Sequence, residues 1–241
     1  MNRDEGESLV GPMLGTDIEI DLTGGSPAMA PLVDASQTYA MDRGLYLRVL
    51  KPTLDRVGAL LALIVVAPLM AFIALAIFVT MGAPVVLRQN RVGLFGRVFT
   101  LYKFRTMAPD RRGLQGEFVG DDRRHTHKSA DDPRITPLGR FLRRTRLDEL
   151  PQFVNVLVGD LSLVGPRPEM VSIVALYESW QHRRHAVKPG ITGLWQISDT
   201  GDKLLFECTE MELVYLEDVS LSADLSIMLR TLPAMARRGG I

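Results

Sequence analysis

The feature that most constrains this fold is a stretch of 31 residues, 57–87, that contains no charged side chain. About 20 consecutive apolar residues are enough to cross a bilayer as a helix, so one interpretation is a transmembrane helix. Apolar residues occur on every face of the stretch, which disfavours a core helix of a soluble protein, because such a helix has a polar face. The stretch therefore predicts a membrane-inserted segment.

Two features of this stretch favour a re-entrant hairpin over a span. Pro68 lies near its middle, where proline removes a backbone hydrogen bond and bends a helix. Residues 57–67 would reach only about 16 Å as a helix, against a hydrocarbon core of about 30 Å. Both flanks are basic, with Arg43, Arg48, Lys51 and Arg56 before the stretch and Arg88, Arg91, Arg97, Lys103 and Arg105 after it. Because basic flanks stay in the cytoplasm, we expect the chain to turn at Pro68 and leave by the same face.

The predicted fold is mainly α with a small β-hairpin element, in three regions. Residues 1–44 are rich in acidic residues, Gly, Ser and Pro, which predicts a disordered N-terminal tail. Residues 45–87 form the re-entrant membrane hairpin, a helix–break–helix with an amphipathic lead-in. Residues 88–241 are expected to form a compact cytoplasmic domain.

Turn residues divide the domain over 88–241 into short elements. The segment 162–170 is expected to be a loop, because Gly165, Pro166 and Pro168 interrupt regular structure. In chain order we expect two strands joined at Gly93 and Gly96, a long polar loop over 108–133, and helices over 135–160 with a break near Asp148 to Pro151. After the loop over 162–170 we expect a helix over about 171–184 and C-terminal helices with a break near Ser220.

Positive charge is concentrated in one part of a chain whose formal net charge is zero. Residues 88–146 contain 15 Lys and Arg but only 6 Asp and Glu. Such an excess suggests an anionic partner: nucleic acid, a phosphate-bearing ligand or anionic lipid headgroups. The single cysteine, Cys208, excludes an intramolecular disulfide and fits a reducing compartment.

The adjacent acids Asp148 and Glu149 are the first candidates for chemistry, because they follow a run of arginines and precede Pro151. One acid can cap a helix N-terminus, and proline is accepted in the first helical turn. Capping leaves the second acid and the arginines unexplained. A carboxylate that arginines keep ionised can attack phosphorus, and a neighbouring carboxylate can hold Mg²⁺. Both interpretations stay open on the residues alone.

Four basic residues are candidates for binding phosphate. Arg143 shortly precedes the two acids, and Arg167 lies between two prolines that fix its backbone, as suits a pre-organised clamp. Lys103 and Arg105 alternate with Phe104 and would share one face of a strand. The alternative for any single arginine is an ordinary solvated position.

The histidines and glycines of the chain support no metal site or nucleotide loop. No cysteine or carboxylate spacing completes a zinc site around the histidine pairs, so we expect solvated histidines at His125, His127, His182 and His185. The glycines of the predicted hairpin do not match the phosphate-binding loop that ends in Lys-Ser/Thr, which disfavours nucleoside triphosphate hydrolysis.

Several long motifs occur in one order along the chain: QNRVGLFGRVFTLYKFRTM, DDPRITPLGRFLRRTRLDELPQFVNVLVGDLSLVGPRPE, HAVKPGITGLWQIS and SADLSIMLRTL. Together they resemble the bacterial sugar transferase family, the monotopic phosphoglycosyl transferases that start glycan assembly on a polyprenol phosphate. The resemblance extends from about residue 50 to residue 232, and several long motifs in order make it highly specific.

The resemblance implies an enzyme that transfers a sugar-1-phosphate from a UDP-sugar to undecaprenyl phosphate, giving undecaprenyl-diphosphate-sugar and UMP. It implies that Asp148 is the nucleophile of a covalent phosphosugar intermediate. Glu149 would then be the Mg²⁺ ligand, with Asp148 beside it. The phosphate-contacting arginines of the family fall on Arg143 and Arg167, and the break of its re-entrant helix falls on Pro68.

The resemblance also implies a place and partners. It predicts a monotopic protein at the cytoplasmic face of the bacterial inner membrane, in its family's short form, that catalyses the first membrane step of exopolysaccharide or related glycan synthesis. It predicts no nucleic-acid partner and leaves a homodimer open. The alternative function is a non-catalytic membrane scaffold or regulator of polysaccharide assembly, which would share the hairpin and the charge excess.

Three positions depart from the family pattern. Lys51-Pro52 replaces a common Lys-Arg, and Ala67-Pro68 replaces a common Ser-Pro. Residues Asp199 to Asp202 (DTGD) stand where many relatives have Gly-Arg. If this last segment contacts the sugar, donor preference differs with it, so the sequence assigns no donor sugar.

Overall fold

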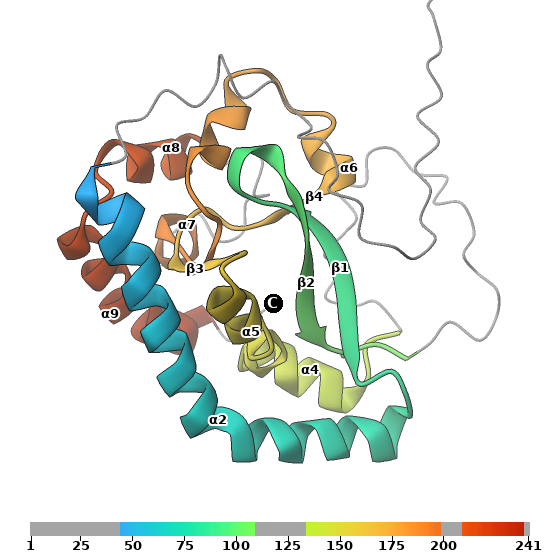
Figure 1. Cartoon of the computed structure of the whole chain (residues 1–241). Coiled ribbons are helices and arrows are strands. Elements are labelled where there is room, and N and C mark those ends of the chain that lie inside the picture. The colour runs from blue at the N-terminus through green and yellow to red at the C-terminus, as the bar shows by residue number, and fades with distance from the viewer. Residues whose placement is uncertain (1–43, 109–133, 199–208, 239–241) are drawn as a thin grey trace, which may run out of the picture.

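The computed structural model describes residues 44–108, 134–198 and 209–238, and Figure 1 shows a mainly α architecture with small β elements, as expected. The expected N-terminal tail, nearly all of the expected loop over 108–133, and the DTGD segment lie outside the described residues. In chain order the elements are η1 (Tyr46–Leu50), α2 (Lys51–Met81), β1 (Val86–Val92), η2 (Leu94–Gly96), β2 (Val98–Phe104), α4 (Pro137–Arg144), η3 (Leu147–Glu149), α5 (Gln152–Val158), β3 (Ser162–Val164), β4 (Glu169–Met170), α6 (Val171–Val174), η4 (Gln181–Ala186), β5 (Gly190–Thr192), α7 (Leu194–Ile197), α8 (Thr209–Glu217) and α9 (Leu221–Arg238).

The long apolar stretch folds as one bent helix, α2, which continues through Pro68. The expected helix–break–helix is therefore corrected to a helix with a bend, visible about midway along α2 in Figure 1. Proline removes the N–H that the carbonyl of Ile64 would accept and crowds that carbonyl, which bends a helix without ending it. The turns on either side keep their own hydrogen bonds.

The two halves of α2 pack on different parts of the domain. In the first half, Ala59 packs with Val156 of α5, and the two side chains are wholly buried. In the second half, Ile73 and Ile77 pack with Leu142 of α4. The bend thus lets one helix follow the surface of the domain around α5 and α4, as Figure 1 shows.

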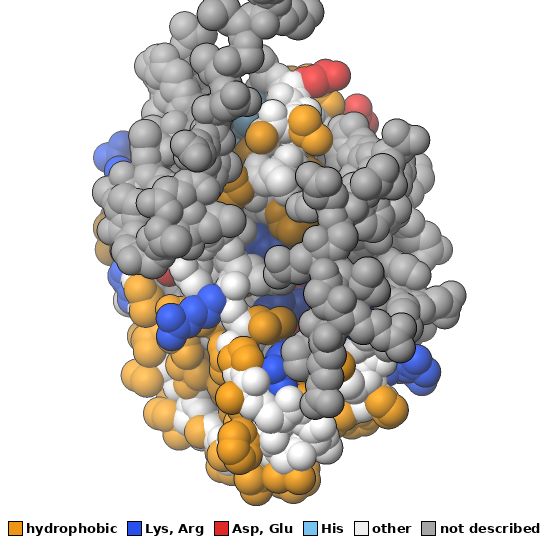
Figure 2. Space-filling model, turned by 90° about the vertical axis from the view of Figure 1, so that its right-hand side faces the viewer, with side chains coloured by type: hydrophobic (Ala, Val, Ile, Leu, Met, Phe, Trp, Pro, Cys, Tyr) orange, Lys and Arg blue, Asp and Glu red, His pale blue; other side chains and the backbone are white. Residues whose placement is uncertain are grey.

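The remaining faces of α2 are apolar and exposed. Within the described part of the chain, Tyr46–Met81 is the one helical stretch long and apolar enough to cross a membrane. Figure 2 shows hydrophobic side chains gathered over the lower end of the molecule, where α2 lies in Figure 1. Large apolar side chains of α2 that are at least two-fifths exposed are Leu54, Val57, Leu60, Leu61, Ile64, Val65, Leu69, Phe72, Leu75, Phe78 and Val79.

The sheets confirm the predicted hairpin and add strands that the sequence did not indicate. β1 and β2 pair antiparallel, from Val86 opposite Phe104 to Val92 opposite Val98. β4 pairs with the other edge of β1, and β3 pairs in parallel with β5 in a separate sheet. The expected loop over 162–170 is therefore wrong at both ends, because those residues pair with strands distant in sequence.

The expected helix over 171–184 is also corrected. Regular α-helix is confined to α6, and residues 181–186 form the 3₁₀ segment η4. Arg184 and His185 in η4 are buried, so tertiary contacts of these polar residues override a weak helical preference. The predicted break near Ser220 is confirmed, since the Ser220 hydroxyl accepts the Ala223 N–H at 3.2 Å as α9 begins.

Polar contacts at the N-terminal end of α2 hold this helix to the domain. Asp55 accepts hydrogen bonds from the Ser162 hydroxyl at 2.7 Å and from the Leu163 N–H at 3.1 Å, both in β3. Lys51 forms a buried ion pair with Asp224 of α9. Buried charges are stable only when they are paired and hydrogen-bonded, so these contacts hold the N-terminal end of α2 in one position on the domain.

Asn155 connects α5 to β2 and is completely buried. Its Oδ1 accepts the Tyr102 N–H at 3.1 Å, and its Nδ2 donates to the Thr100 carbonyl at 2.7 Å. β2 is an edge strand of its sheet, so this side chain satisfies backbone groups that no strand pairs. The contact fixes the strand that bears Lys103 against the helix that follows Asp148 and Glu149.

We expect Asn155→Leu to lower the free energy of unfolding by about 2 to 5 kcal/mol, because two partly buried backbone groups lose their hydrogen-bond partner. Asn155→Asp keeps the acceptor for Tyr102 but loses the donor, so its loss should be smaller. Denaturant titration of detergent-solubilised protein measures both. Val154→Ala, next in sequence and partly exposed, is the control. Equal stability of Asn155→Leu and the control would contradict this role.

Candidate active site

A short turn between α4 and α5 positions the two adjacent acids. α4 ends at Arg144, Arg146 adopts a left-handed backbone with φ of 58°, and Asp148 and Glu149 follow in η3. A left-handed conformation is strained in a residue other than glycine, and such strain is concentrated at functional sites. The predicted break in the helix is confirmed, and it extends from Thr145 to Pro151, between α4 and α5.

The capping interpretation of this turn is wrong. The N-cap position of α5 is occupied by Pro151, and no side chain caps that helix end. Asp148 and Glu149 instead lie in η3, where they are 4% and 8% exposed. Burial of two adjacent carboxylates is unfavourable unless cations compensate it, so the contacts of the pair define the site.

Lys103 of β2 contacts both acids. Its Nζ lies 3.1 Å from Oδ2 of Asp148 and 3.3 Å from Oε1 of Glu149. A single ammonium between two carboxylates reduces the repulsion that would otherwise protonate one of them. The structure thus brings this predicted site residue to the dyad.

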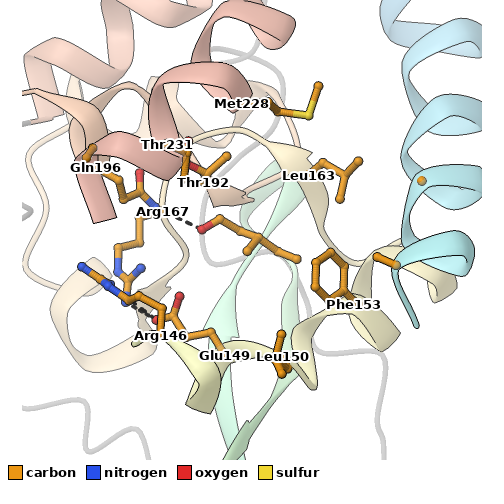
Figure 3. Close-up of a pocket in the computed structure, with 14 residues that line it drawn as sticks. Arg146, Glu149, Leu150, Phe153, Leu163, Arg167, Thr192, Gln196, Met228 and Thr231 are labelled. Atoms are coloured by element: carbon orange, nitrogen blue, oxygen red, sulfur yellow. Dashed lines mark hydrogen bonds and ion pairs between the residues drawn. The ribbon is translucent and has the colours of Figure 1, made fainter. Parts of the chain in front are cut away.

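Two arginines complete the charge around Glu149. Nη2 of Arg167 donates to Oε1 of Glu149 at 2.9 Å, and Nη1 of Arg146 lies 3.8 Å from the same atom (Figure 3). Burial would raise the pKa of Glu149, but the charges of Arg167, Lys103 and Arg146 outweigh burial and hold that pKa well below its usual range. Glu149 is therefore an anion at any physiological pH.

The other two predicted phosphate ligands have different contacts. Nε of Arg143, in the last turn of α4, donates to the Thr106 hydroxyl at 2.9 Å. Arg105 donates to the carbonyls of Ala83 at 3.0 Å and Gly82 at 2.6 Å, and to that of Met81, at the C-terminal end of α2. A cation is favourable at a helix C-terminus, so Arg105 stabilises α2 there while Lys103 contacts the dyad.

The backbone of Arg167 is held from both sides by a buried ion pair. Glu212 of α8 accepts the Arg167 N–H at 2.8 Å, and Arg184 of η4 donates to the Arg167 carbonyl at 2.5 Å. Arg184 and Glu212 contact each other at 2.5 Å and are 1% and 2% exposed. Burial raises the pKa of Glu212 to about 7, although Arg184 opposes this increase. The pair fixes the segment that carries Arg167 between its two prolines.

The histidines do not form a metal site in the described chain. No group of three His, Cys, Asp or Glu residues with metal-binding proximity occurs there. His185 is buried and its pKa lies well below the usual value, mainly because of burial. The expectation of a solvated side chain is therefore wrong for His185, which packs on Tyr177 at a ring distance of 6.2 Å.

The dyad has the donor set for a divalent cation that also binds substrate phosphate. Oδ1 of Asp148 is buried and, among the residues that the structure describes, has no hydrogen-bond partner. Mg²⁺ in proteins commonly takes one or two carboxylates together with substrate phosphates and water. An orphaned carboxylate oxygen beside a second acid fits this ligand set, so the residues present fit Mg²⁺.

A cavity of about 400 Å³ extends from the dyad toward α2 (Figure 3). Arg146, Glu149 and Arg167 lie at its charged end. The other lining residues are mostly apolar and come from α2, the turn before α5, α5, β3, β5, α7 and α9. They are Gly58, Ala62, Leu150, Phe153, Leu163, Ile191, Thr192, Gln196, Met228, Thr231 and Ala234. The arrangement can place an anionic group against Arg146 and Arg167 and an apolar group beside it.

Three residues of the site were missed by sequence reasoning. Arg146 was visible as a member of the arginine run, but nothing in the sequence distinguished it from Arg143. Arg184 and Glu212 gave no signal, because an arginine and a glutamate 28 positions apart show no motif. Their burial as a pair depends on how η4 and α8 pack.

We expect Glu212→Ala to speed amide hydrogen exchange at Arg167 by about tenfold or more, because a hydrogen bond to a charged acceptor contributes about 1.5 to 3 kcal/mol. Glu212→Gln keeps an oxygen acceptor and should give a smaller increase. Exchange mass spectrometry of the peptide containing Arg167 measures this effect. Glu210→Ala, exposed on the same helix, is the control. Unchanged exchange in a folded Glu212→Ala protein would show that the pair does not hold Arg167.

Comparison with known proteins places the chain among sugar transferases. The bacterial sugar transferase family model matches residues 46–238. Galactosyl transferase CpsE of Streptococcus agalactiae is 41% identical over 199 residues, which are 81% of this chain and 44% of that protein. The UDP-glucose:undecaprenyl-phosphate glucose-1-phosphate transferase of Escherichia coli is 39% identical, over 76% of this chain and 39% of that protein.

A relative of similar length covers the same region. The uncharacterized sugar transferase EpsL of Bacillus subtilis is 38% identical over 193 residues, which are 80% of this chain and 90% of that protein. The chain thus spans less than half of CpsE and of the Escherichia coli enzyme, but most of EpsL. With the family model matching through all three described ranges, the chain belongs to the bacterial sugar transferase family.

Proposed function

We propose that this protein transfers a sugar-1-phosphate from a UDP-sugar to undecaprenyl phosphate and releases UMP. The observation that carries the proposal is the buried dyad of Asp148 and Glu149, on which Lys103, Arg146 and Arg167 converge. Two anionic substrates require such a cationic pocket. The names of relatives support the reaction, since two of them are an undecaprenyl-phosphate galactose phosphotransferase and a glucose-1-phosphate transferase.

The proposed mechanism has two displacements at one phosphorus. A carboxylate oxygen of Asp148 attacks the β-phosphorus of the donor, and the bond to the bridging oxygen breaks, so UMP leaves with the electron pair. The phosphosugar is then bonded to Asp148 as an acyl phosphate. An oxygen of the acceptor phosphate attacks the same phosphorus, and Asp148 leaves again as a carboxylate. One site therefore serves both substrates in turn.

The surrounding residues have separate tasks in this mechanism. Lys103 contacts Asp148 through an ion pair and orients its carboxylate for attack. Arg167, held by Arg184 and Glu212, offers guanidinium donors to phosphate oxygens. Asp148 and Glu149 would hold Mg²⁺, which supplies charge neutralisation for the diphosphate.

The scaffold alternative does not account for the buried acids. A protein that only binds anionic lipid needs a basic surface, whereas burying two adjacent carboxylates opposes that purpose. Among the described residues, one buried oxygen of Asp148 has no hydrogen-bond partner, an unfavourable contribution that a structural role leaves unexplained. Catalysis gives that oxygen a use.

We expect Asp148→Asn to reduce UMP release from a UDP-sugar, in the presence of Mg²⁺ and acceptor, by at least about a thousandfold, because the amide is no nucleophile. A donor labelled in its β-phosphate should leave a transient label on the wild-type protein and none on the variant. Asp218→Asn, at an exposed position, is the matched control and should keep normal turnover. Normal turnover by Asp148→Asn would show that Asp148 is not the nucleophile.

We further propose that α2 inserts into the cytoplasmic face of the bacterial inner membrane without crossing it. The exposed apolar faces of α2 and the bend at Pro68 support insertion, and the polar contacts of Lys51 and Asp55 at one end hold the helix to the catalytic domain. Basic residues on both flanks favour a return to the cytoplasm. A step in exopolysaccharide synthesis is in keeping with the name of a relative, the exopolysaccharide production protein ExoY of Rhizobium meliloti.

The topology predicts that epitope tags at residue 2 and at residue 241 both face the cytoplasm. Protease added to spheroplasts should leave both tags intact, and it should remove both after permeabilisation. A periplasmic protein digested in the intact spheroplasts is the control. Digestion of one tag alone in intact spheroplasts would show that α2 spans the membrane.

A further inference from the structure

The cavity beside the dyad combines a charged end with apolar walls. Arg146 and Arg167 lie at the end nearest Glu149, and Phe153, Leu163 and Met228 form the walls beyond it (Figure 3). Its volume of about 400 Å³ is within the range of small-molecule sites in proteins. A ligand that fits both parts has an anionic head and an apolar body attached to it.

The wall on the side of α2 is made of small residues. Gly58 and Ala62 are one helical turn apart and line the cavity. A Cβ atom built on Gly58 would lie only 3.0 Å from Cδ1 of Leu163, so a larger residue there would displace the cavity wall. Other faces of the same turns carry Leu61 and Val65, which are 59% and 77% exposed. The cavity therefore lies against the apolar helix that we propose to be in the membrane.

The two threonine hydroxyls of the walls are bonded to the protein itself, and Nε2 of Gln196 donates to the Ile191 carbonyl at 3.3 Å. The hydroxyls of Thr192 and Thr231 are 2.7 Å apart and bond to each other, and the Thr231 hydroxyl also donates to the Ile227 carbonyl. A sugar or nucleoside placed here would bring several hydroxyl and amide groups against apolar side chains. Burying such groups without partners is unfavourable, whereas burying hydrocarbon is favourable.

We propose that this cavity binds the phosphate-proximal isoprene units of the lipid acceptor, with the acceptor phosphate at Arg146 and Arg167. The inference rests on the proposed transferase function and adds to it a site for one substrate. A cavity of this size holds only the first units of a long polyprenyl chain, so the rest of the chain stays in the bilayer beside α2. The donor sugar and nucleotide bind outside the apolar part of the cavity.

The test fills the cavity from two different helices. Ala62→Phe adds bulk from α2, and Met228→Trp adds bulk from α9. Matched controls place the same side chains outside it: Ala71→Phe on an exposed position of α2, and Leu229→Trp at a position that is 66% exposed. Thermal unfolding in detergent identifies any variant that fails to fold, and the two helices give independent results.

Measuring the two half-reactions separately distinguishes acceptor binding from donor binding. Both filling variants should raise the KM for undecaprenyl phosphate by about tenfold or more, the range expected for steric changes in a hydrophobic pocket. Single-turnover UMP release from the donor without acceptor should stay within about twofold of wild type, and the controls should change neither value. A filling variant that slows UMP release and leaves the acceptor KM unchanged would assign the cavity to the donor. No change in either value would mean that the cavity binds no substrate.

A binding measurement tests the site without turnover. A farnesyl phosphate that carries a diazirine on its first isoprene unit should label wild-type residues of the cavity, and both filling variants should reduce this labelling. If wild type released no UMP from any UDP-sugar, the proposed function would fail, while this labelling would still decide the lipid site. Labelling confined to exposed faces of α2 would overturn the inference.

Discussion

Charge compensation of two buried neighbours, Asp148 and Glu149, is the constraint on which the rest of the structure depends. Removing a carboxylate from water is unfavourable by several kcal/mol, and two side by side also repel each other. The compensating cations come from three places: Lys103 from β2, Arg167 from the segment between β3 and β4, and Arg146 from the turn itself. The sheet, the turn and the proline-flanked segment must therefore meet at one point.

Contacts around the two acids explain how these segments keep their positions relative to one another. Asn155 holds β2 against α5, so the strand with Lys103 keeps its distance to the acids. The buried pair Arg184–Glu212 holds the backbone of Arg167 on both sides. Separating buried groups that are hydrogen-bonded to each other is unfavourable. The segments that carry the cations are therefore held in position before any substrate binds. The first half of α2 packs on the same part of the domain, and its small residues leave room for the apolar cavity.

Sequence reasoning predicted the parts of the site that have a local signature. The turn with two acids, Arg167 between prolines, the hairpin that carries Lys103 and the apolar stretch with Pro68 all follow from residue type and spacing. It failed where a partner is distant in sequence. Arg105 looked equivalent to Lys103 but bonds to the end of α2, and His185 was expected to be solvated but is buried. Periodicity shows which faces are apolar, not which buried polar groups meet.

The sequence by itself determined the family, the mainly α class, the uncharged stretch and the position of the acids, because these depend on composition, order and local backbone preference. Only the tertiary structure decided which cations reach Glu149, that α2 bends without breaking, and that a cavity extends from the dyad to Gly58 and Ala62. The physical reason is that ion pairs and cavities depend on distances between elements remote in the chain. Those distances are set by packing and by satisfying buried polar groups, which no single segment contains.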